Sequence, residues 1–282
     1  MDWALNDQES AMVQRYVEID ERTRALRESI RHCALGVTGF EEAYTMSLIF
    51  HENGLEGVVL GYAEIKSAVD NKLISDVSLL PMYQRIKNQK ACIDQMREKA
   101  RAKRFIVTVP FLKELHAKLV EDPRDAGAWR RDIPIHRTYF HEITQPAKIE
   151  PALDSVLNFL KARHDKTLHP IELAANVHHR FLRVFPFSDH SGTIGRLLAN
   201  FVLMHAGYLP VIIHASDRQR YYEALRTNER EFRNFVTEAM ENSLDNAHRF
   251  FTTQTDGEPL PQMRPSATQM RRAGDSRPRV NA

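Results

Sequence analysis

Apolar positions recur at helical intervals along most of the chain, whereas strand-like alternation is rare. Glycine is also scarce, at 11 of 282 residues. The pattern predicts an all-α (mostly α) protein. Its helices are expected at about 8–35, 39–71, 83–101, 108–120, 149–163, 170–184, 218–225 and 229–251, the second of them bent at its glycines.

Two segments depart from the surface-helix pattern. Residues 194–208 are apolar on nearly every side, which predicts a buried central helix. Residues 133–144 instead alternate between apolar and polar side chains and predict a β-hairpin.

Composition and charge exclude several classes of protein. The chain has 39 Lys and Arg against 37 Asp and Glu, so net charge indicates neither a nucleic-acid nor a membrane partner. No apolar run approaches the roughly 18–20 residues that span a bilayer, and the first residues do not resemble a signal peptide. Cys33 and Cys92 provide neither a disulfide framework nor a zinc site. We expect a soluble, cytoplasmic protein, with residues 252–282 forming a disordered basic tail.

Arg196 is the first candidate for chemistry, because it lies one turn inside the apolar central helix. A buried guanidinium is costly unless it has a partner, so Arg196 requires a carboxylate or an anionic ligand. Asn200, four residues later, adds a second polar group to the same helix face.

The loop before this helix, FPFSDHSGT, brings backbone N–H groups to a helix N-terminus, which is a ready anion site. Gly192 allows a ligand to approach the backbone, Asp189 can hold a divalent cation or act as a base, and His190 titrates near neutral pH. The alternative is that Ser188 or Asp189 is an ordinary N-cap and His190 a surface residue.

Four stretches in order, FLKELHAKL, AGAWRRDIPIHRT, HPIELAANVHHRFLRVFPFSDHSGTIGRLLANFVLMHAGYLPVII and DRQRYYEALR, resemble the Fic (Fic/DOC) family. The resemblance implies a helical bundle around a buried central helix with one β-hairpin flap. It divides the chain into an N-terminal helical region at 1–104, a Fic domain at 105–251 and the tail at 252–282.

The signature of the family, H-x-F-x-[D/E]-G-N-G-R-x-x-R, is altered here. Phe185 stands at the position of the catalytic histidine, His190 and Ser191 replace the Gly-Asn pair that binds phosphates, and Thr193 replaces a phosphate-binding arginine. Phe187, Asp189, Gly192 and Arg196 are retained. The resemblance implies that Asp189 coordinates magnesium and that Arg196 meets a γ-phosphate or an inhibitory glutamate. We predict that Ser188, Ser191, Gly192, Thr193, Arg196 and Asn200 contribute to the anion site.

Upstream, residues 51–60 (HENGLEGVVL) resemble the inhibitory helix that many Fic proteins carry, here at about 44–70. The inhibitory motif [S/T]-x-x-x-E-[G/N] aligns with Glu52, Glu56 and Gly57, with Glu52 in place of the hydroxyl residue. We therefore predict an ion pair between Glu56 and Arg196.

The resemblance assigns further positions. Ile135, Arg137 and Tyr139 belong to the flap on which a target protein docks, and Tyr221 and Tyr222 fall where the pocket wall is expected, although core packing is an equal alternative. We interpret His178 and His179 as scaffold residues. The partner is then a small anionic ligand or a docked target protein, and a homodimer is left open.

Three functions remain open. The first is a diverged Fic enzyme acting on a phosphate-containing or other anionic ligand, with Asp189 and His190 as catalytic residues. The second is a pseudoenzyme with a binding or regulatory role, in which Phe185 fills the space of the missing imidazole. The third is ordinary transfer of AMP from ATP to a protein hydroxyl. A general base typically contributes about 10²–10⁴-fold in rate, so its loss disfavours the third function. No cofactor is required by the pattern; the candidates are Mg²⁺ and a nucleotide.

Overall fold

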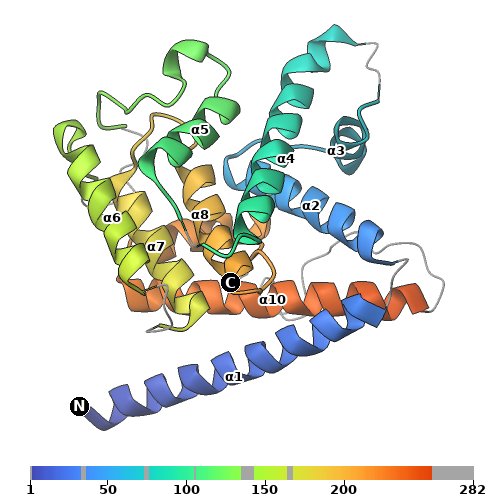
Figure 1. Ribbon diagram of the computed structural model, residues 1–282, viewed down its shortest axis with the longest axis vertical. Coiled ribbons are helices and arrows are strands. Elements are labelled where there is room, and N and C mark those ends of the chain that lie inside the picture. The colour runs from blue at the N-terminus through green and yellow to red at the C-terminus, as the bar shows by residue number, and fades with distance from the viewer. Residues whose placement is uncertain are drawn as a thin grey trace, which may run out of the picture. The chain divides into compact units, whose positions relative to one another are not determined.

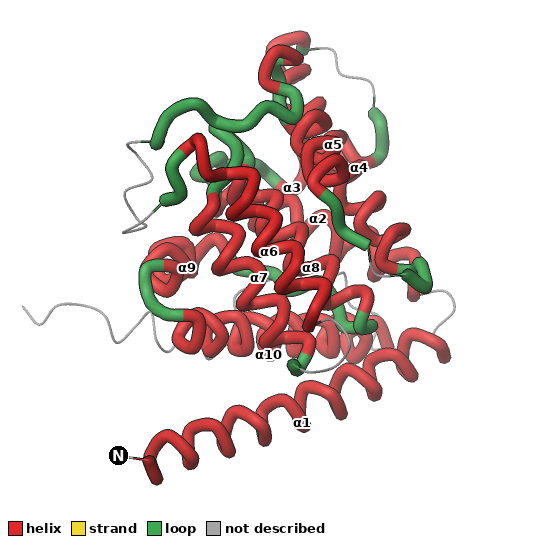
Figure 2. The backbone as a smooth tube through the Cα atoms, turned by 60° about the vertical axis from the view of Figure 1, so that its left-hand side comes forward, coloured by secondary structure: helices red, strands yellow, loops and turns green. Residues whose placement is uncertain are grey.

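The computed structural model describes residues 2–32, 36–72, 76–104, 106–134, 143–163 and 168–255. Within these ranges the chain is helical, and no strand is present (Figure 2). The α-helices are α1 (Asp2–His32), α2 (Gly36–Leu55), α3 (Tyr62–Val69), α4 (Leu80–Ala100), α5 (Val109–Leu119), α6 (Ile149–Arg163), α7 (Pro170–Val184), α8 (Ser191–His205), α9 (Arg218–Leu225) and α10 (Glu229–Thr255). The predicted all-α class is confirmed, and the expected bend separates α2 from α3.

The described residues pack as two units, one formed by those within 2–42 and 239–255 and the other by those within 43–238. In the first unit, α1 pairs with the C-terminal part of α10. Arg15 holds Glu241 through two hydrogen bonds of 2.7 and 2.8 Å, and the Phe40 and Phe250 rings meet edge to face at 5.2 Å. No helix in the described ranges is long and apolar enough to cross a membrane.

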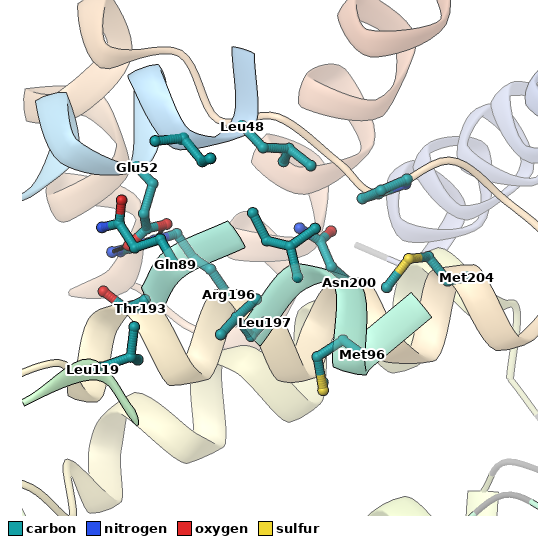
Figure 3. A pocket seen from close by; sticks show the side chains of 13 residues that line it. Leu48, Glu52, Gln89, Met96, Leu119, Thr193, Arg196, Leu197, Asn200 and Met204 are labelled. Atoms are coloured by element: carbon teal, nitrogen blue, oxygen red, sulfur yellow. Dashed lines mark hydrogen bonds and ion pairs between the residues drawn. The ribbon is translucent and has the colours of Figure 1, made fainter. Parts of the chain in front are cut away.

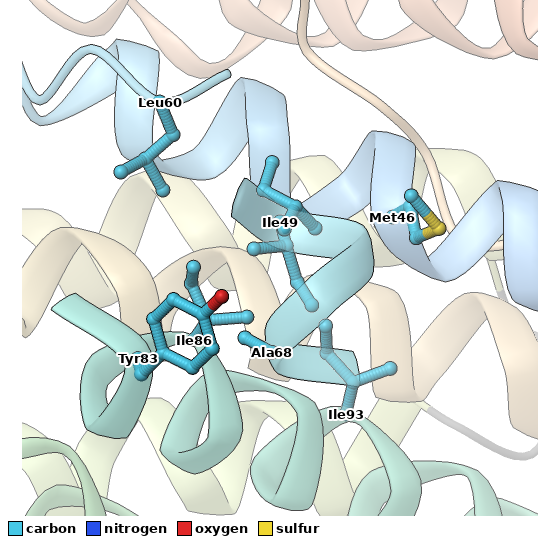
Figure 4. Close-up of a cluster of buried hydrophobic side chains, with 8 residues drawn as sticks. Met46, Ile49, Leu60, Ala68, Tyr83, Ile86 and Ile93 are labelled. Atoms are coloured by element: carbon cyan, nitrogen blue, oxygen red, sulfur yellow. The ribbon is translucent and has the colours of Figure 1, made fainter. Parts of the chain in front are cut away.

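In the second unit, α8 lies against α7 on one side and α4 on another, and α6 packs on α7 (Figure 1). The side chains of α8 are buried along nearly its whole length, which confirms the central helix that the apolar run predicts. A core cluster joins α2, α3 and α4 and includes Met46, Ile49, Ile65, Tyr83 and Ile86 (Figure 4). It fixes the C-terminal half of α2 beside the start of α8.

Local signals in the sequence explain where the helices around the site begin. At α5, the Thr108 side chain accepts a hydrogen bond from the N–H of Phe111, and Pro110 follows in the first turn. At α7, the Nδ1 atom of His169 accepts from the N–H of Ile171, and Pro170 opens the helix.

Candidate functional site

The signature loop, residues 185–190, connects α7 to α8 and begins and ends on a residue with left-handed backbone. Phe185 has φ 46° and ends α7, and His190 has φ 56° and directly precedes α8. Left-handed backbone costs a residue with a Cβ atom about 1–2 kcal/mol relative to glycine. The loop therefore holds a histidine where backbone geometry favours glycine.

Hydrogen bonds within the loop fix its shape. The buried Ser191 hydroxyl accepts from the N–H of Phe187 at 2.8 Å and donates to the Phe187 carbonyl at 2.9 Å. Asp189 caps the turn, because its Oδ1 atom accepts from the N–H of His190 at 2.8 Å. The Ser191 hydroxyl is thus engaged within the loop. Ser191 could therefore contact a ligand only through its backbone N–H.

His116 of α5 packs against the signature loop. Its ring stacks on Phe187 with a centroid distance of 4.0 Å, and its Nδ1 atom accepts from the N–H of Gly127 at 3.1 Å. Burial, and then the charge of His190, lowers the pKa of His116 to about 4, so the ring is neutral at neutral pH. No pattern in the sequence indicates His116 as part of the site.

Arg130 is a second residue that supports the loop and was not predicted from the sequence. Its guanidinium is buried and donates to the carbonyl oxygens of Val184, Phe185, Asp132 and Thr144. The main-chain N–H of Arg130 donates to the carbonyl oxygen of Pro186. A cation is favourable at the carbonyl end of a helix, here α7. The available signal was its place in a stretch that resembles the family.

The charge cluster, which we define as Arg196, Glu52, Glu56 and Tyr221, lies between α2, α8 and α9. Nε of Arg196 donates to Glu52 at 2.7 Å, Nη2 donates to both Glu52 and Glu56 at 2.5 Å, and Nη1 donates to the Tyr221 hydroxyl at 3.1 Å. The three charged side chains are 7–16% exposed. The predicted ion pair of Glu56 with Arg196 is present, and Glu52 is a second carboxylate partner that the motif did not indicate. The regulatory role of either glutamate stays a prediction.

Gly192 lies directly against this cluster. A Cβ atom at this position would come within 2.7 Å of Oε1 of Glu56 and 3.1 Å of Nη1 of Arg196. The carboxylate of Glu56 therefore lies at the N-terminus of α8, where the first N–H groups of a helix have no intrahelical acceptor. A carboxylate of the chain itself therefore lies beside the helix terminus at which the sequence predicts an anion site.

The remaining predicted residues divide between scaffold and cavity. The Asn200 side chain bonds the main chain of Val211 in both directions, at 2.7 and 3.2 Å. The Tyr222 hydroxyl donates to the Leu55 carbonyl. Nε2 of His178 lies 3.0 Å from the Tyr221 hydroxyl, and burial lowers its pKa well below the usual value.

Two small cavities flank Arg196. One, of about 40 Å³, lies between α2, α4 and α8 (Figure 3). Its polar lining residues are Glu52, Gln89, Thr193, Arg196 and Asn200, and the others are apolar. The hydroxyl oxygen of Thr193 is buried there without a hydrogen-bond partner in the described part of the chain. The other, of about 30 Å³, is lined by His51, Glu52 and Arg196 among others.

A third space, which we call the cleft, has a volume of about 840 Å³. Ser188, Asp189 and His190 line it, together with His116 and residues between Val120 and Pro134. The Asp189 side chain is 69% exposed and that of His190 is 7% exposed. None of these three spaces is lined by both Asp189 and Arg196.

Two expectations find no structural counterpart. Ile135, Arg137 and Tyr139 of the predicted flap lie outside the described residues. Within the residues that are described, no three His, Cys, Asp or Glu side chains group as a metal site, and the magnesium-binding role of Asp189 stays a prediction.

The helical arrangement and the loop before α8 define the class of protein. Residues 106–203 match the model of the Fic/DOC family, so this stretch of the chain carries a Fic/DOC domain. This match confirms the resemblance to the Fic/DOC family that the sequence motifs indicate.

Curated relatives include proteins named protein adenylyltransferase Fic. That of Culex quinquefasciatus is 28% identical over 82% of this chain and 47% of its own length. That of Drosophila melanogaster is 29% identical over 73% of this chain and 42% of its own length. The chain thus spans about half the length of the curated relatives it matches.

Two solved structures share the fold. A Fic domain containing signaling protein from Bacteroides thetaiotaomicron matches with a TM-score of 0.73 at 23% identity, covering 87% of this chain and 99% of that one. Fic-1 from C. elegans, residues 134–508, matches with a TM-score of 0.73 at 20% identity, over 88% and 76% of the two chains.

Proposed function

We propose that this chain is a diverged Fic-fold enzyme that binds a phosphate-containing ligand at the N-terminus of α8 and transfers or hydrolyses a phosphate-linked group. One observation carries the proposal: the Glu56 carboxylate contacts Arg196 and lies against Gly192, so the site already holds an anion. A phosphate oxygen offers the same acceptor chemistry to a guanidinium and to backbone N–H groups.

Binding then requires that Glu56 leave. Arg196 and the first N–H groups of α8 would hold the phosphate, and Asp189 would provide one carboxylate oxygen to a magnesium ion. Mg²⁺ commonly keeps several waters and takes only one or two protein carboxylates alongside phosphate, so a single exposed aspartate fits it. When bound, the ion would neutralise charge on the phosphate oxygens.

His190 is the proposed proton acceptor, since Phe185 has no titratable group. In a transfer step, an acceptor oxygen bonds to phosphorus, the bond from phosphorus to the leaving oxygen breaks, and the proton of the acceptor passes to the imidazole. The position of His190 in the wall of the cleft, with Nε2 3.6 Å from Oδ2 of Asp189, supports this role. In hydrolysis, the acceptor is water.

Two observations favour a second candidate, a binding or regulatory pseudoenzyme. The Phe185 side chain is fully buried, and Asp189 and Arg196 line separate spaces. The relatives named protein adenylyltransferases keep AMP transfer as a third outcome.

Binding and turnover separate these functions. The double variant Glu52→Gln/Glu56→Gln is incubated with Mg²⁺ and α-labelled ATP, and separately with AMP, while phosphate, nucleoside and labelled protein are followed. We expect binding of phosphate-containing probes by calorimetry and turnover that is lost in Asp189→Ala and in His190→Gln. Binding without any product would support the pseudoenzyme. Labelled protein that persists in His190→Gln would contradict the assigned base, and failure to bind any probe would contradict the proposal.

Glu229→Gln is the matched control. Glu229 also accepts two hydrogen bonds from an arginine, Arg180, at 2.7 and 3.2 Å, but it lies outside the charge cluster. Its substitution is expected to leave probe binding at the wild-type level.

A further inference from the structure

The two glutamates of the charge cluster bind Arg196 in different ways. Glu52 accepts from Nε and from Nη2, so its carboxylate and the guanidinium form a planar, two-bond pair. Glu56 accepts from Nη2 through one oxygen, and that same oxygen is the atom nearest a Cβ at Gly192. Glu56 therefore occupies the anion site, whereas Glu52 lies beside it.

This division has an electrostatic consequence. A two-bond arginine–carboxylate pair is among the stronger interactions between side chains and has fixed geometry. If an incoming phosphate displaces Glu56, nothing in this arrangement requires Glu52 to leave as well. The charge of Arg196 then remains matched by Glu52, and Nη1 remains bonded to Tyr221.

Space around Arg196 leads to the same conclusion. The cavities on its two sides measure about 40 and 30 Å³, and Glu52 lines both. A second or third phosphate entering there would meet the Glu52 carboxylate at close range, and like charges at such distances repel. The buried Thr193 hydroxyl in the larger cavity can bond a ligand oxygen, but it supplies no positive charge.

We propose that Glu52 is a specificity-determining residue that makes this site select ligands with a single phosphate over polyphosphates. The inference rests on the proposed function, because it concerns the same anion site. It narrows the ligand class to phosphate monoesters or diesters, with Glu52 retained on Arg196 and the phosphate in the place of the Glu56 carboxylate.

Calorimetric titration of the full chain with AMP and with ATP, each with Mg²⁺, tests the inference. The proteins are the wild type, Glu56→Gln, Glu52→Gln/Glu56→Gln and the control Glu229→Gln. In Glu56→Gln we expect AMP to bind at least as tightly as ATP. Adding Glu52→Gln should tighten ATP about tenfold or more, the scale of one interaction with a charged group, and change AMP by less than about threefold.

The outcomes are distinct from those for the proposed function. If Glu56→Gln already binds ATP tenfold more tightly than AMP, or if the second substitution leaves their ratio unchanged, the role of Glu52 is overturned while phosphate binding stands. If no variant binds either probe, the proposed function fails and this inference with it. Glu52→Asp/Glu56→Gln, which keeps the charge at position 52 on a shorter side chain, should retain the preference for AMP. It guards against a folding artefact in the Glu52→Gln/Glu56→Gln variant.

Discussion

The charge cluster and the cleft lie at the same end of α8, yet they are filled in opposite ways. Around Arg196, the carboxylates of the chain itself occupy the space and only small cavities remain. Around Asp189 and His190, the cleft is about 840 Å³ and the Asp189 carboxylate is largely exposed. The candidate anion site beside Arg196 is therefore filled by side chains of the chain itself, whereas the cleft beside the candidate base His190 is open.

The largest expected effect on stability comes from removing the cation of the charge cluster. Arg196→Met leaves the Glu52 carboxylate buried without its cation, so we expect the free energy of unfolding to fall by about 3–5 kcal/mol. Urea denaturation measures the loss. Arg180→Met, in a pair that is more than one-third exposed, should cost only about 1 kcal/mol. Equal losses at the two positions would show that the cluster is not a buried ion pair in solution.

The next effect concerns His116 beneath the cleft. Its pKa is lowered to about 4 in the folded state, whereas an unperturbed histidine titrates near 6.5. Stability from the neutral ring is therefore complete above pH 6.5 and is lost as pH falls toward 4, by about 1.4 kcal/mol per pH unit.

His116→Phe keeps a ring against Phe187 and removes the titration. The measurement is the free energy of unfolding between pH 7 and 4. In the variant this free energy should fall less steeply with decreasing pH, by a slope that corresponds to about one proton. Other buried histidines account for the slope that remains, since burial and the neighbouring His214 lower the pKa of His51 to about 3. A slope identical to that of the wild type would contradict the burial of His116.

Gly192→Ala tests how closely the cluster approaches α8. The added methyl would lie 2.7 Å from Glu56 and 3.1 Å from Arg196, so we expect a loss of about 1–3 kcal/mol. Combining it with Glu56→Ala should recover part of that loss, a coupling that a double-mutant cycle measures. Gly39→Ala, which meets nothing within 4 Å, is the control and should be neutral or slightly stabilising. Strict additivity of Gly192→Ala and Glu56→Ala would place Glu56 away from the helix terminus.

The smallest effect isolates backbone strain in the open half. Both His190→Gly and His190→Ala remove the imidazole, but only glycine relieves the left-handed backbone at φ 56°. The glycine variant should therefore be more stable than the alanine variant by about 1 kcal/mol in urea denaturation. No difference between them would mean that the loop relaxes to another conformation.

Much of this arrangement follows from the sequence, for identifiable reasons. The periodic apolar spacing located the helices, and the single charge within the apolar run of α8 identified Arg196 as a residue that needs a partner. The motif at Glu56 then supplied that partner. The helices and Arg196 could be predicted because helical periodicity and burial cost act on residues near one another in the chain. The pair with Glu56 joins residues 140 positions apart, and it was predicted only through the motif of the resembled family.

Contacts between distant segments were harder to infer. Arg130 bonds Phe185 across 55 positions, and His116 stacks on Phe187 from another helix, so spacing along the chain gives no signal for either. Glu52 was placed at the right motif position, but its two-bond geometry depends on how α2 packs against α8. The separation of the cleft from the cavities beside Arg196 likewise depends on packing.

Arg130 has a consequence for how such a loop can change over time. In each hydrogen bond described for its guanidinium, the acceptor is a main-chain carbonyl oxygen. Every amino acid supplies that oxygen, so side chains in the loop can be exchanged while this anchorage persists. A loop that is held through its main chain tolerates substitutions of its side chains. A phenylalanine at position 185 is then compatible with the same loop conformation.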